Sequence, residues 1–288
     1  MIAEAQPGAV PVAVLHRTPP VARLPIARAA VIGLGVAFTF GLIVVPLLLV
    51  FYEAFAGGLG ALEAVFSDSY AQSAIVLTLE IAAATVVFNT LFGVLAGWTL
   101  AMYRFPGKAI LQSLIDVPLS VSPVVAGLAI LLCVGERTPF GTWLLAHGIR
   151  LAFAPPGIAL ATIFVTFPYV ARAFSSYLRE RGRELEEAAL VLGASVWQTF
   201  WRVTLPEARR ALLGGVLLTN ARALGEFGAV SVISGHIRGL TNTVPLHIEN
   251  LYDEDSFAQA FVLAASLATV TILLTLLRSL VDRRRPGR

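Results

Sequence analysis

Two ionisable residues, Arg222 and Glu226, lie within a long apolar stretch of this 288-residue chain. Charge inside an apolar helix is costly and usually functional. Their spacing of four places them on one face of a helix, where they can pair. Such a pair either fixes the packing of helices or lies in an anion pathway with Arg222 as the donor. Asn220, on the same stretch, is expected to bond to a neighbouring helix or to line the same pathway.

Ser120 and Ser122 stand beside two prolines, Pro118 and Pro123, which interrupt another apolar stretch. Proline breaks helical hydrogen bonding, and a broken helix frees backbone N–H groups that can line a substrate path. Hydroxyl and amide groups suit an anion that must bind weakly enough to leave. The alternative is an ordinary kink, with both serines bonded to the preceding turn.

Residues for metal binding or catalysis are not arranged in a recognisable pattern. His236 and His247 are too far apart for a zinc-type motif, and the acidic run Asp253–Asp255 is expected to be a solvated rim. Cys133 is the one cysteine, which excludes a disulfide scaffold and a cysteine-based zinc cage. No G-x-x-x-x-G-K-[ST] loop for phosphates occurs. We therefore expect no catalytic residue, no metal site and no cofactor bound by this chain.

The composition explains why so few residues could do chemistry. The chain is 57% hydrophobic and 14% charged, with a mean hydropathy of +0.80, whereas soluble domains carry roughly 25% charged residues. A soluble enzyme and a largely disordered chain are both excluded. The arginines sit at the ends of apolar runs rather than on one basic face, so no nucleic-acid partner is expected.

Six apolar runs are long enough to cross a bilayer, which requires about 20 residues each. The sequence therefore predicts an all-α polytopic membrane protein in contact with membrane lipid. Ala54–Ala56 resembles a signal-peptide cleavage site, but the run before it is too long for a signal core. The six predicted spans are 29–52, 72–101, 109–134, 158–177, 210–233 and 257–280.

Lysine and arginine set the orientation, because they concentrate on the cytoplasmic side. With both termini inside, the outside loops hold only Arg137, Arg150 and Arg238 of the 21 basic residues. We therefore predict an inner-membrane protein with both termini cytoplasmic. Its parts are a disordered tail (1–28), a transmembrane domain (29–281) that includes the cytoplasmic loop 178–209, and a basic cytoplasmic tail (282–288).

The loop 178–209 reads as two helices. Apolar residues at 185, 188, 189 and 192 share one helical face, and Gly193 suits a left-handed helix end. Ser195 and Gln198 have capping-box spacing for a second helix. On that helix Trp197, Phe200 and Trp201 are predicted to share a face, and Pro206 is expected in the first turn of the next span. The loop is either packed on its own spans or docks on a cytoplasmic partner.

The same loop resembles the EAA motif of ABC-importer permeases, which reads E-A-A, three residues, G, nine residues, an aliphatic residue, x, L-P. In that family the loop is the coupling helix that sits in a groove of the ATPase subunit. The resemblance therefore implies ATPase coupling by a set of residues matched here and on the adjoining helix: Glu187, Ala188, Ala189, Gly193, Trp197, Phe200, Trp201, Leu205 and Pro206.

The resemblance extends over about residues 75–283. Segments 120–127, 161–170, 220–229 and 234–243 are similar to the molybdate/sulfate branch, and 231–249 is most similar to the W-type sulfate/thiosulfate permease subunit. It implies the type I ABC-importer permease fold. It also implies four partners: two ABC ATPase subunits, which use ATP and Mg, a sibling permease subunit giving a heterodimer, and a periplasmic sulfate-binding protein.

These features favour the non-catalytic membrane subunit of an ATP-driven sulfate/thiosulfate importer that works by alternating access. A molybdate or tungstate permease remains an alternative, because these oxyanions share charge and shape. A less favoured alternative is an autonomous secondary carrier, which would not need the helix pair within 178–209. Arg222, Glu226, Asn220, Ser120 and Ser122 are the candidates for the translocation path.

Overall fold

The structure is a computed structural model that describes residues 25–283. The chain divides into two units, Met1–Leu48 and Leu49–Arg288, which are considered separately. A helix begins at Pro25, within the predicted tail 1–28, because proline is well suited to the first helical turn. The last helix continues to Arg283, within the predicted tail 282–288. The rest of the predicted tails, 1–24 and 284–288, lies outside the described residues.

The first unit contains α1 (Pro25–Thr39), the π-helical turn η1 (Phe40–Val44) and the start of α2 (Val45–Ala56). Together they form an uninterrupted apolar run, Arg28–Ala56, with a mean hydropathy of 2.6 and enough length for one span. The π turn ends just before Pro46. Proline has no N–H for the helical ladder, and a π turn shifts the ladder locally.

Three further helices of the second unit are long and apolar enough to cross a membrane: α4 (Ser69–Met102), α8 (Pro155–Arg181) and α14 (Phe257–Arg283). Asp68 begins α4 by accepting a hydrogen bond from the Ala71 N–H at 2.9 Å. The α4 and α8 helices approach closely at Gly97, where a Cβ atom would lie 2.7 Å from the Ala171 carbonyl oxygen. Small residues therefore bring the two central helices together.

The predicted span 109–134 is a bent pair rather than one kinked helix. It consists of α5 (Lys108–Ser120) and α6 (Pro123–Val134), with an angle of 113° between them. Pro123 occupies the first turn of α6, and Val121 and Ser122 take extended conformations between the helices. Two half-helices thus replace the single interrupted span that the sequence predicts.

The predicted span 210–233 begins too late, although its predicted end lies within one residue of the end of the last helix. A continuous helical run extends from Val196 to Leu224 and contains α10 (Val196–Thr199), η2 (Phe200–Thr204) and α11 (Leu205–Leu224). After a break, α12 (Gly228–Ser234) follows at 50°. Pro206 lies in the first turn of α11, as predicted, and α11 continues the helix from the π turn η2.

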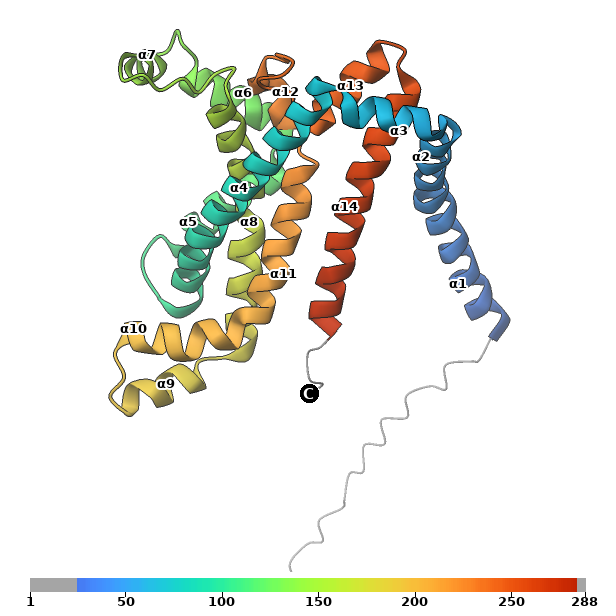
Figure 1. Ribbon diagram of the computed structural model, residues 1–288. Helices are drawn as coiled ribbons and strands as arrows, with labels where there is room; N and C mark the ends of the chain where they lie inside the picture. Colours follow the sequence, from blue (N-terminus) through green and yellow to red (C-terminus); the bar gives the residue numbers. More distant parts are fainter. Residues whose placement is uncertain (1–24, 284–288) are drawn as a thin grey trace, which may run out of the picture. The chain divides into compact units, whose positions relative to one another are not determined.

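Four shorter helices complete the described chain: α3 (Gly58–Ser67), α7 (Pro139–Ala146), α9 (Glu184–Val191) and α13 (Val244–Asp253). Figure 1 shows α9 and α10 at one end of the second unit and α7, α12 and α13 at the other. The described residues contain no strand. Four long helices and two bent pairs make six spans if each pair counts as one, which confirms the predicted all-α polytopic class.

Candidate functional site: an exposed helix pair and two helix breaks

The α9–α10 helix pair has the local geometry that the sequence predicts. Gly193 follows α9 with φ +86°, a left-handed conformation that glycine adopts without strain. Ser195 caps α10 in a full capping box, since its hydroxyl accepts from the Gln198 N–H and the Gln198 side chain accepts from the Ser195 N–H. These short-range devices hold two short helices against each other at a tight turn.

The turn between the helices carries a group of exposed apolar side chains that we name the apolar tip. Val191 and Leu192 are each 88% exposed, and Trp197 is 60% exposed. Monomeric soluble surfaces rarely gather such side chains unless a partner covers them, and tryptophan is enriched at binding hot spots. The apolar tip consists of Leu185, Val191, Leu192, Val196, Trp197 and Trp201.

Phe200 does not belong to that exposed face, contrary to the prediction. It is buried, and its ring lies 4.7 Å from the ring of Trp98 on α4, measured between centroids. Trp197 and Trp201 pack edge to face at 5.5 Å on the exposed side. The π turn that begins at Phe200 rotates this residue toward the core, so Phe200 anchors the helix pair while the two tryptophans remain available.

The other motif residues divide between surface and core. Glu187 and Ala188 are exposed and Ala189 is half-buried on α9, while Leu205 is half-buried and Pro206 exposed on α11. Glu187 lines a mostly apolar cavity of about 240 Å³ together with Trp98 and Phe200. The structure therefore brings the motif residues together at one end of the second unit.

An ion pair that sequence reasoning missed fixes the base of the helix pair. Arg181, at the end of α8, pairs with Glu186 on α9, and both side chains are largely buried. The Glu186 carboxylate also accepts from the Thr204 hydroxyl at 2.9 Å. One carboxylate thus connects α8, α9 and η2. The signal available in the sequence was the polar Glu186 beside an apolar helical face.

Two further arginines attach this end to α4. The guanidinium of Arg183 donates to the Ala101 carbonyl oxygen at 2.7 Å. Arg179 donates to the Leu100 carbonyl oxygen at 3.5 Å and to the Gln112 side-chain oxygen at 3.1 Å. Cations suit the C-terminal carbonyls of a helix, which carry partial negative charge. The α9–α10 pair is therefore rigidly connected to the long helices.

The two helix breaks lie next to each other. A Cβ atom at Gly228 would lie 3.0 Å from Pro123 Cβ, and one at Gly127 would lie 2.5 Å from the Ala229 carbonyl oxygen. The start of α6 therefore packs tightly on the start of α12. Ser120 and Ser122 are exposed at the α5–α6 break, so their hydroxyls are accessible beside the second break.

The predicted Arg222–Glu226 pair forms, although not on one helix. The Arg222 guanidinium lies 3.0 Å from the Glu226 carboxylate, but α11 ends at Leu224, so Glu226 belongs to the break before α12. Glu226 is 1% exposed at its side chain and Arg222 is 36% exposed. Glu226 also accepts from the Ala229 N–H at 3.1 Å. Asn220 is half-buried one turn earlier on α11.

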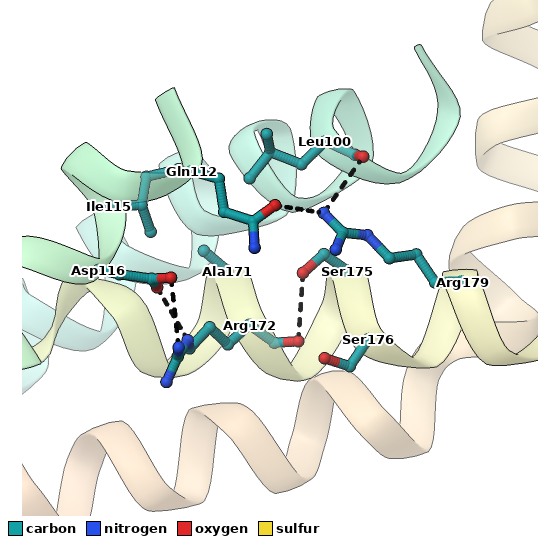
Figure 2. Close-up of a pocket in the computed structure, with 9 residues that line it drawn as sticks. All are labelled: Leu100, Gln112, Ile115, Asp116, Ala171, Arg172, Ser175, Ser176 and Arg179. Carbon is teal, nitrogen blue, oxygen red and sulfur yellow. Dashed lines mark hydrogen bonds and ion pairs between the residues drawn. The ribbon is translucent and has the colours of Figure 1, made fainter. Parts of the chain in front are cut away.

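Two other polar groups connect helices. The Asn89 amide on α4 donates to the Thr166 hydroxyl on α8 at 2.8 Å. Asp116 on α5 pairs with Arg172 on α8, with 2.8 Å between the carboxylate oxygen and Nε (Figure 2). Both contacts lie between helices that would otherwise be held by apolar packing alone.

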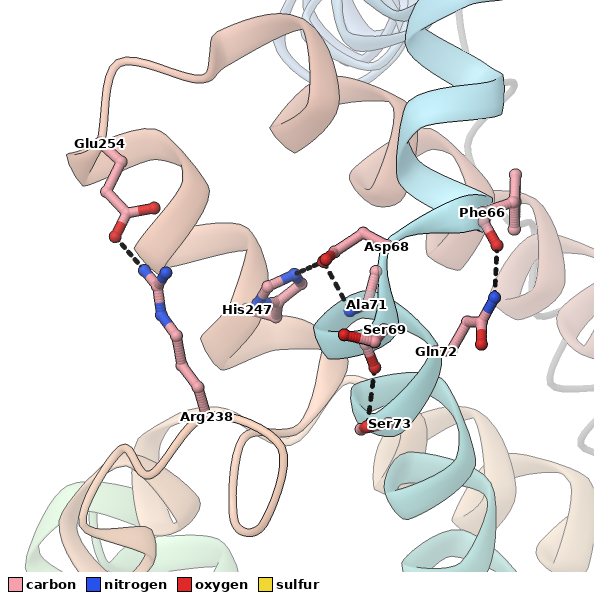
Figure 3. Close-up of polar contacts among 9 residues, drawn as sticks. All are labelled: Phe66, Asp68, Ser69, Ala71, Gln72, Ser73, Arg238, His247 and Glu254. Atoms are coloured by element: carbon pink, nitrogen blue, oxygen red, sulfur yellow. Dashed lines mark hydrogen bonds and ion pairs between the residues drawn. The ribbon is translucent and has the colours of Figure 1, made fainter.

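Histidine is buried at the opposite end of the second unit, on α13. His247 Nε2 lies 3.6 Å from the Asp68 carboxylate that caps α4 (Figure 3). Burial lowers the pKa of His247 below its ordinary value, although the nearby Asp68 carboxylate opposes this shift. No group of three metal-ligating side chains occurs among the described residues. His247 is thus a neutral packing residue at neutral pH.

The comparison with known families decides the identity. Residues 89–286 match the family described as the binding-protein-dependent transport system inner membrane component. The chain belongs to this family. Its matched region includes both helix breaks and the α9–α10 pair, so the two arrangements described above belong to a transport-system membrane subunit.

Individual relatives agree with this family assignment. The chain is 46% identical over 253 residues to the sulfate transport system permease protein CysW of Synechocystis, covering 88% of this chain and 92% of that protein. It is 38% identical over 210 residues to the sulfate transport system permease protein CysT of Escherichia coli, covering 73% and 76%. The predicted resemblance to the W-type subunit is therefore confirmed.

The fold is shared with solved transporters. A chain of a bacterial alginate ABC transporter superposes with a TM-score of 0.74 at 17% identity, covering 92% of this chain and 98% of that one. Identity this low shows the fold alone. The predicted ABC-importer permease fold is thereby confirmed, and the chain is a non-catalytic transport subunit by family.

Proposed function

We propose that the chain is the membrane-spanning subunit of an ATP-driven importer of sulfate and thiosulfate. The observation that carries the proposal is the 46% identity to a sulfate transport system permease protein over 88% of this chain. The lower identity to CysT, 38%, favours a pair of unlike permease subunits, with this chain in the W-type position and a T-type sibling beside it.

The apolar tip supports an ATPase partner. Its tryptophans and aliphatic residues are exposed on a helix pair that Arg181–Glu186 and Arg183 hold rigidly. Such a surface can transmit the closure of two ATPase subunits, which use ATP and Mg, to α8 and α11. The differential contact required for an ATP-driven change of state would be made there. This chain itself would bind no cofactor.

The remaining assignments follow from the same proposal. Both termini would lie in the cytoplasm with α9 and α10, as the distribution of basic residues favours. The opposite end, with α7 and α13, would face a periplasmic sulfate-binding protein. The anion would pass near the helix breaks, where Ser120, Ser122, Asn220 and Arg222 offer hydroxyl, amide and guanidinium groups beside Glu226.

Uptake of labelled sulfate tests the substrate. Cells deleted for the chain and complemented from a plasmid should regain uptake, and excess thiosulfate but not molybdate should block it. Uptake blocked far better by molybdate would assign the chain to the molybdate branch. Unchanged uptake with and without the plasmid would contradict the proposal.

A pair of glycine variants tests the role of the helix pair in the same cells. Gly193→Asp should fail to restore uptake, because φ +86° strains any side chain and the charge lies at the apolar tip. Gly148→Asp is the control, since Gly148 has φ +76° with open space around it at the opposite end. Equal uptake by the two variants would remove the α9–α10 turn from the mechanism.

A further inference from the structure

A basic cavity lies where α4 ends, α5 begins and α8 ends, apart from the apolar tip and the helix breaks. Its volume is about 420 Å³. Four cationic side chains line it: Arg104, Lys108, Arg179 and Arg183. The other described residues that line it are neutral, so no carboxylate balances the four charges within the cavity.

The cations are held in place by neutral groups. Arg183 and Arg179 donate to the carbonyl oxygens at the end of α4, and Lys108 donates to the Tyr103 carbonyl oxygen at 3.1 Å. These bonds orient the side chains without neutralising them. Gathering like charges at fixed positions is unfavourable unless an anion binds among them.

The helix geometry adds positive potential to the same place. Lys108 is the first residue of α5, and Gly107 precedes it with φ +86° and no side chain to cap the helix. The N-terminus of a helix carries partial positive charge and free N–H groups, which favour a phosphate group. The cavity thus combines a helix N-terminus with four cations, three of which are oriented by hydrogen bonds.

A neighbouring cavity adjoins the basic cavity along α5 and α8. It has a volume of about 250 Å³ and shares Gln112 and Arg179 with the basic cavity (Figure 2). Its wall is mostly polar and also includes Ser175, Ser176 and the Asp116–Arg172 pair. A ligand with a phosphate group and a second polar group would fit the two cavities together.

We propose that these cavities bind a phosphate oxyanion, with the headgroup of an anionic phospholipid as the favoured source. The ends of three membrane helices meet there, and basic pockets between such helices bind acidic headgroups. Arg179 and Arg183 each bond to α4 and flank the α8–α9 junction, so a bound headgroup would stiffen the base of the helix pair. The proposal does not depend on which anion is transported.

Native mass spectrometry of the complete transporter tests the site by titration with phosphatidylglycerol and, separately, phosphatidylcholine. Arg104→Gln with Lys108→Gln should weaken phosphatidylglycerol binding about 30-fold, because each basic residue near an anionic surface contributes roughly fivefold. Arg202→Gln with Arg209→Gln removes equal charge from exposed positions of the continuous helix and is the control. Arg104→Gln alone keeps the Lys108 bond to Tyr103 and should weaken binding about fivefold.

Inorganic phosphate added to the loaded transporter distinguishes the two sources. Phosphatidylglycerol retained against millimolar phosphate would assign the site to a lipid, and its displacement would assign the site to a free oxyanion. Both results support an oxyanion site if the Arg104 and Lys108 variants lose binding. The proposal would be overturned if the wild type and the variants, at equal yield of complex, bound phosphatidylglycerol equally well and also bound phosphate equally well.

Discussion

The α9–α10 helix pair and the two helix breaks place polar and apolar groups in opposite ways. At the helix pair the charge is at the base, where Arg181 and Glu186 are buried, and apolar side chains are exposed at the tip. At the breaks small and apolar residues pack closely, as Gly228 does against Pro123, and polar groups are accessible or paired nearby. In the proposed importer, the first region would be covered by a protein partner and the second would be passed by a polar solute.

Under the proposed function, the region that receives the movement of the ATPase would be separate from the region that the anion passes. Buried pairing at Arg181–Glu186 makes the helix pair a stiff lever on α8 and η2, since one carboxylate connects three elements. The breaks end helices within the span, and their contacts are the close packing of α6 on α12 and the Arg222–Glu226 pair, in which Glu226 is buried. The first three predictions below act on these two regions, and each is compared with a reference variant.

Loss of the buried pair at the base should have the largest effect on stability. Glu186→Ala leaves Arg181 buried without its partner and removes the acceptor for Thr204. We expect the free energy of unfolding to fall by about 3–5 kcal/mol. Thermal unfolding of the purified complex measures the effect. Glu184→Ala, at an exposed position of the same helix, is the control. Equal melting temperatures of the two variants would contradict the rigid connection through Glu186.

Loss of the Arg222–Glu226 pair at the breaks should give the next largest effect on stability. Arg222→Gln leaves the Glu226 carboxylate buried with only the Ala229 N–H, and should destabilise the chain by about 3 kcal/mol. Adding Glu226→Gln should recover most of that loss, because the charge is then removed. Thermal unfolding follows the recovery, and sulfate uptake by the double variant shows whether Arg222 also serves transport. A single variant as stable as the wild type would exclude a structural role for the pair.

Substitutions in the apolar tip should weaken assembly with the ATPase rather than folding. Trp197→Ala and Trp201→Ala should each weaken binding to the ATPase about 30-fold, as for hot-spot residues worth about 2 kcal/mol. Affinity measured by titration of the ATPase onto the permease pair in nanodiscs checks this. Trp143→Ala on α7 is a matched control, because Trp143 is comparably exposed at the opposite end. Unchanged affinity in the Trp197 variant would mean that the tip is not the docking surface.

The smallest effect is expected from His247 on α13, which belongs to neither region. Its pKa is lowered in the folded chain by burial, so the unfolded chain takes up a proton more readily as the pH falls. The stability contributed by neutral His247 is present above the ordinary pKa of about 6.5 and is lost as the pH falls through the folded pKa. His247→Gln should flatten the decline of melting temperature between neutral and acidic pH.

The His247 prediction has its own reference. His236→Gln, which changes a part-exposed histidine at the same end, is the reference variant. A decline in melting temperature that is identical in the wild type and both variants would show that other groups determine it.

Local sequence signals predicted the helix pair better than the breaks. The Gly193 turn and the Ser195–Gln198 capping box depend on neighbours within four residues, and both are confirmed. Phe200 was misplaced on the exposed face, because it is buried against Trp98 of α4 and no local sequence period encodes that contact. The Arg181–Glu186 pair was missed, since it needs the fold to bring α8 and α9 together.

For the breaks, the sequence predicted only where the helices are interrupted. Pro118 and Pro123 indicated an interruption, but the 113° angle between α5 and α6 results from packing against α12. The spacing of Arg222 and Glu226 predicted their pairing correctly, for the wrong reason, because the helix ends between them. The positions of the polar groups in this region therefore depend on how the helix ends are arranged in three dimensions.

The most direct test of the account is transport by the purified complex in proteoliposomes. Labelled sulfate should accumulate only when ATP is supplied on the α9–α10 side and the binding protein on the α7–α13 side. Gly193→Asp should abolish accumulation, and Gly148→Asp should leave it intact. Accumulation without ATP, or an undiminished rate in the Gly193 variant, would contradict the claim that the helix pair couples ATP hydrolysis to passage through the breaks.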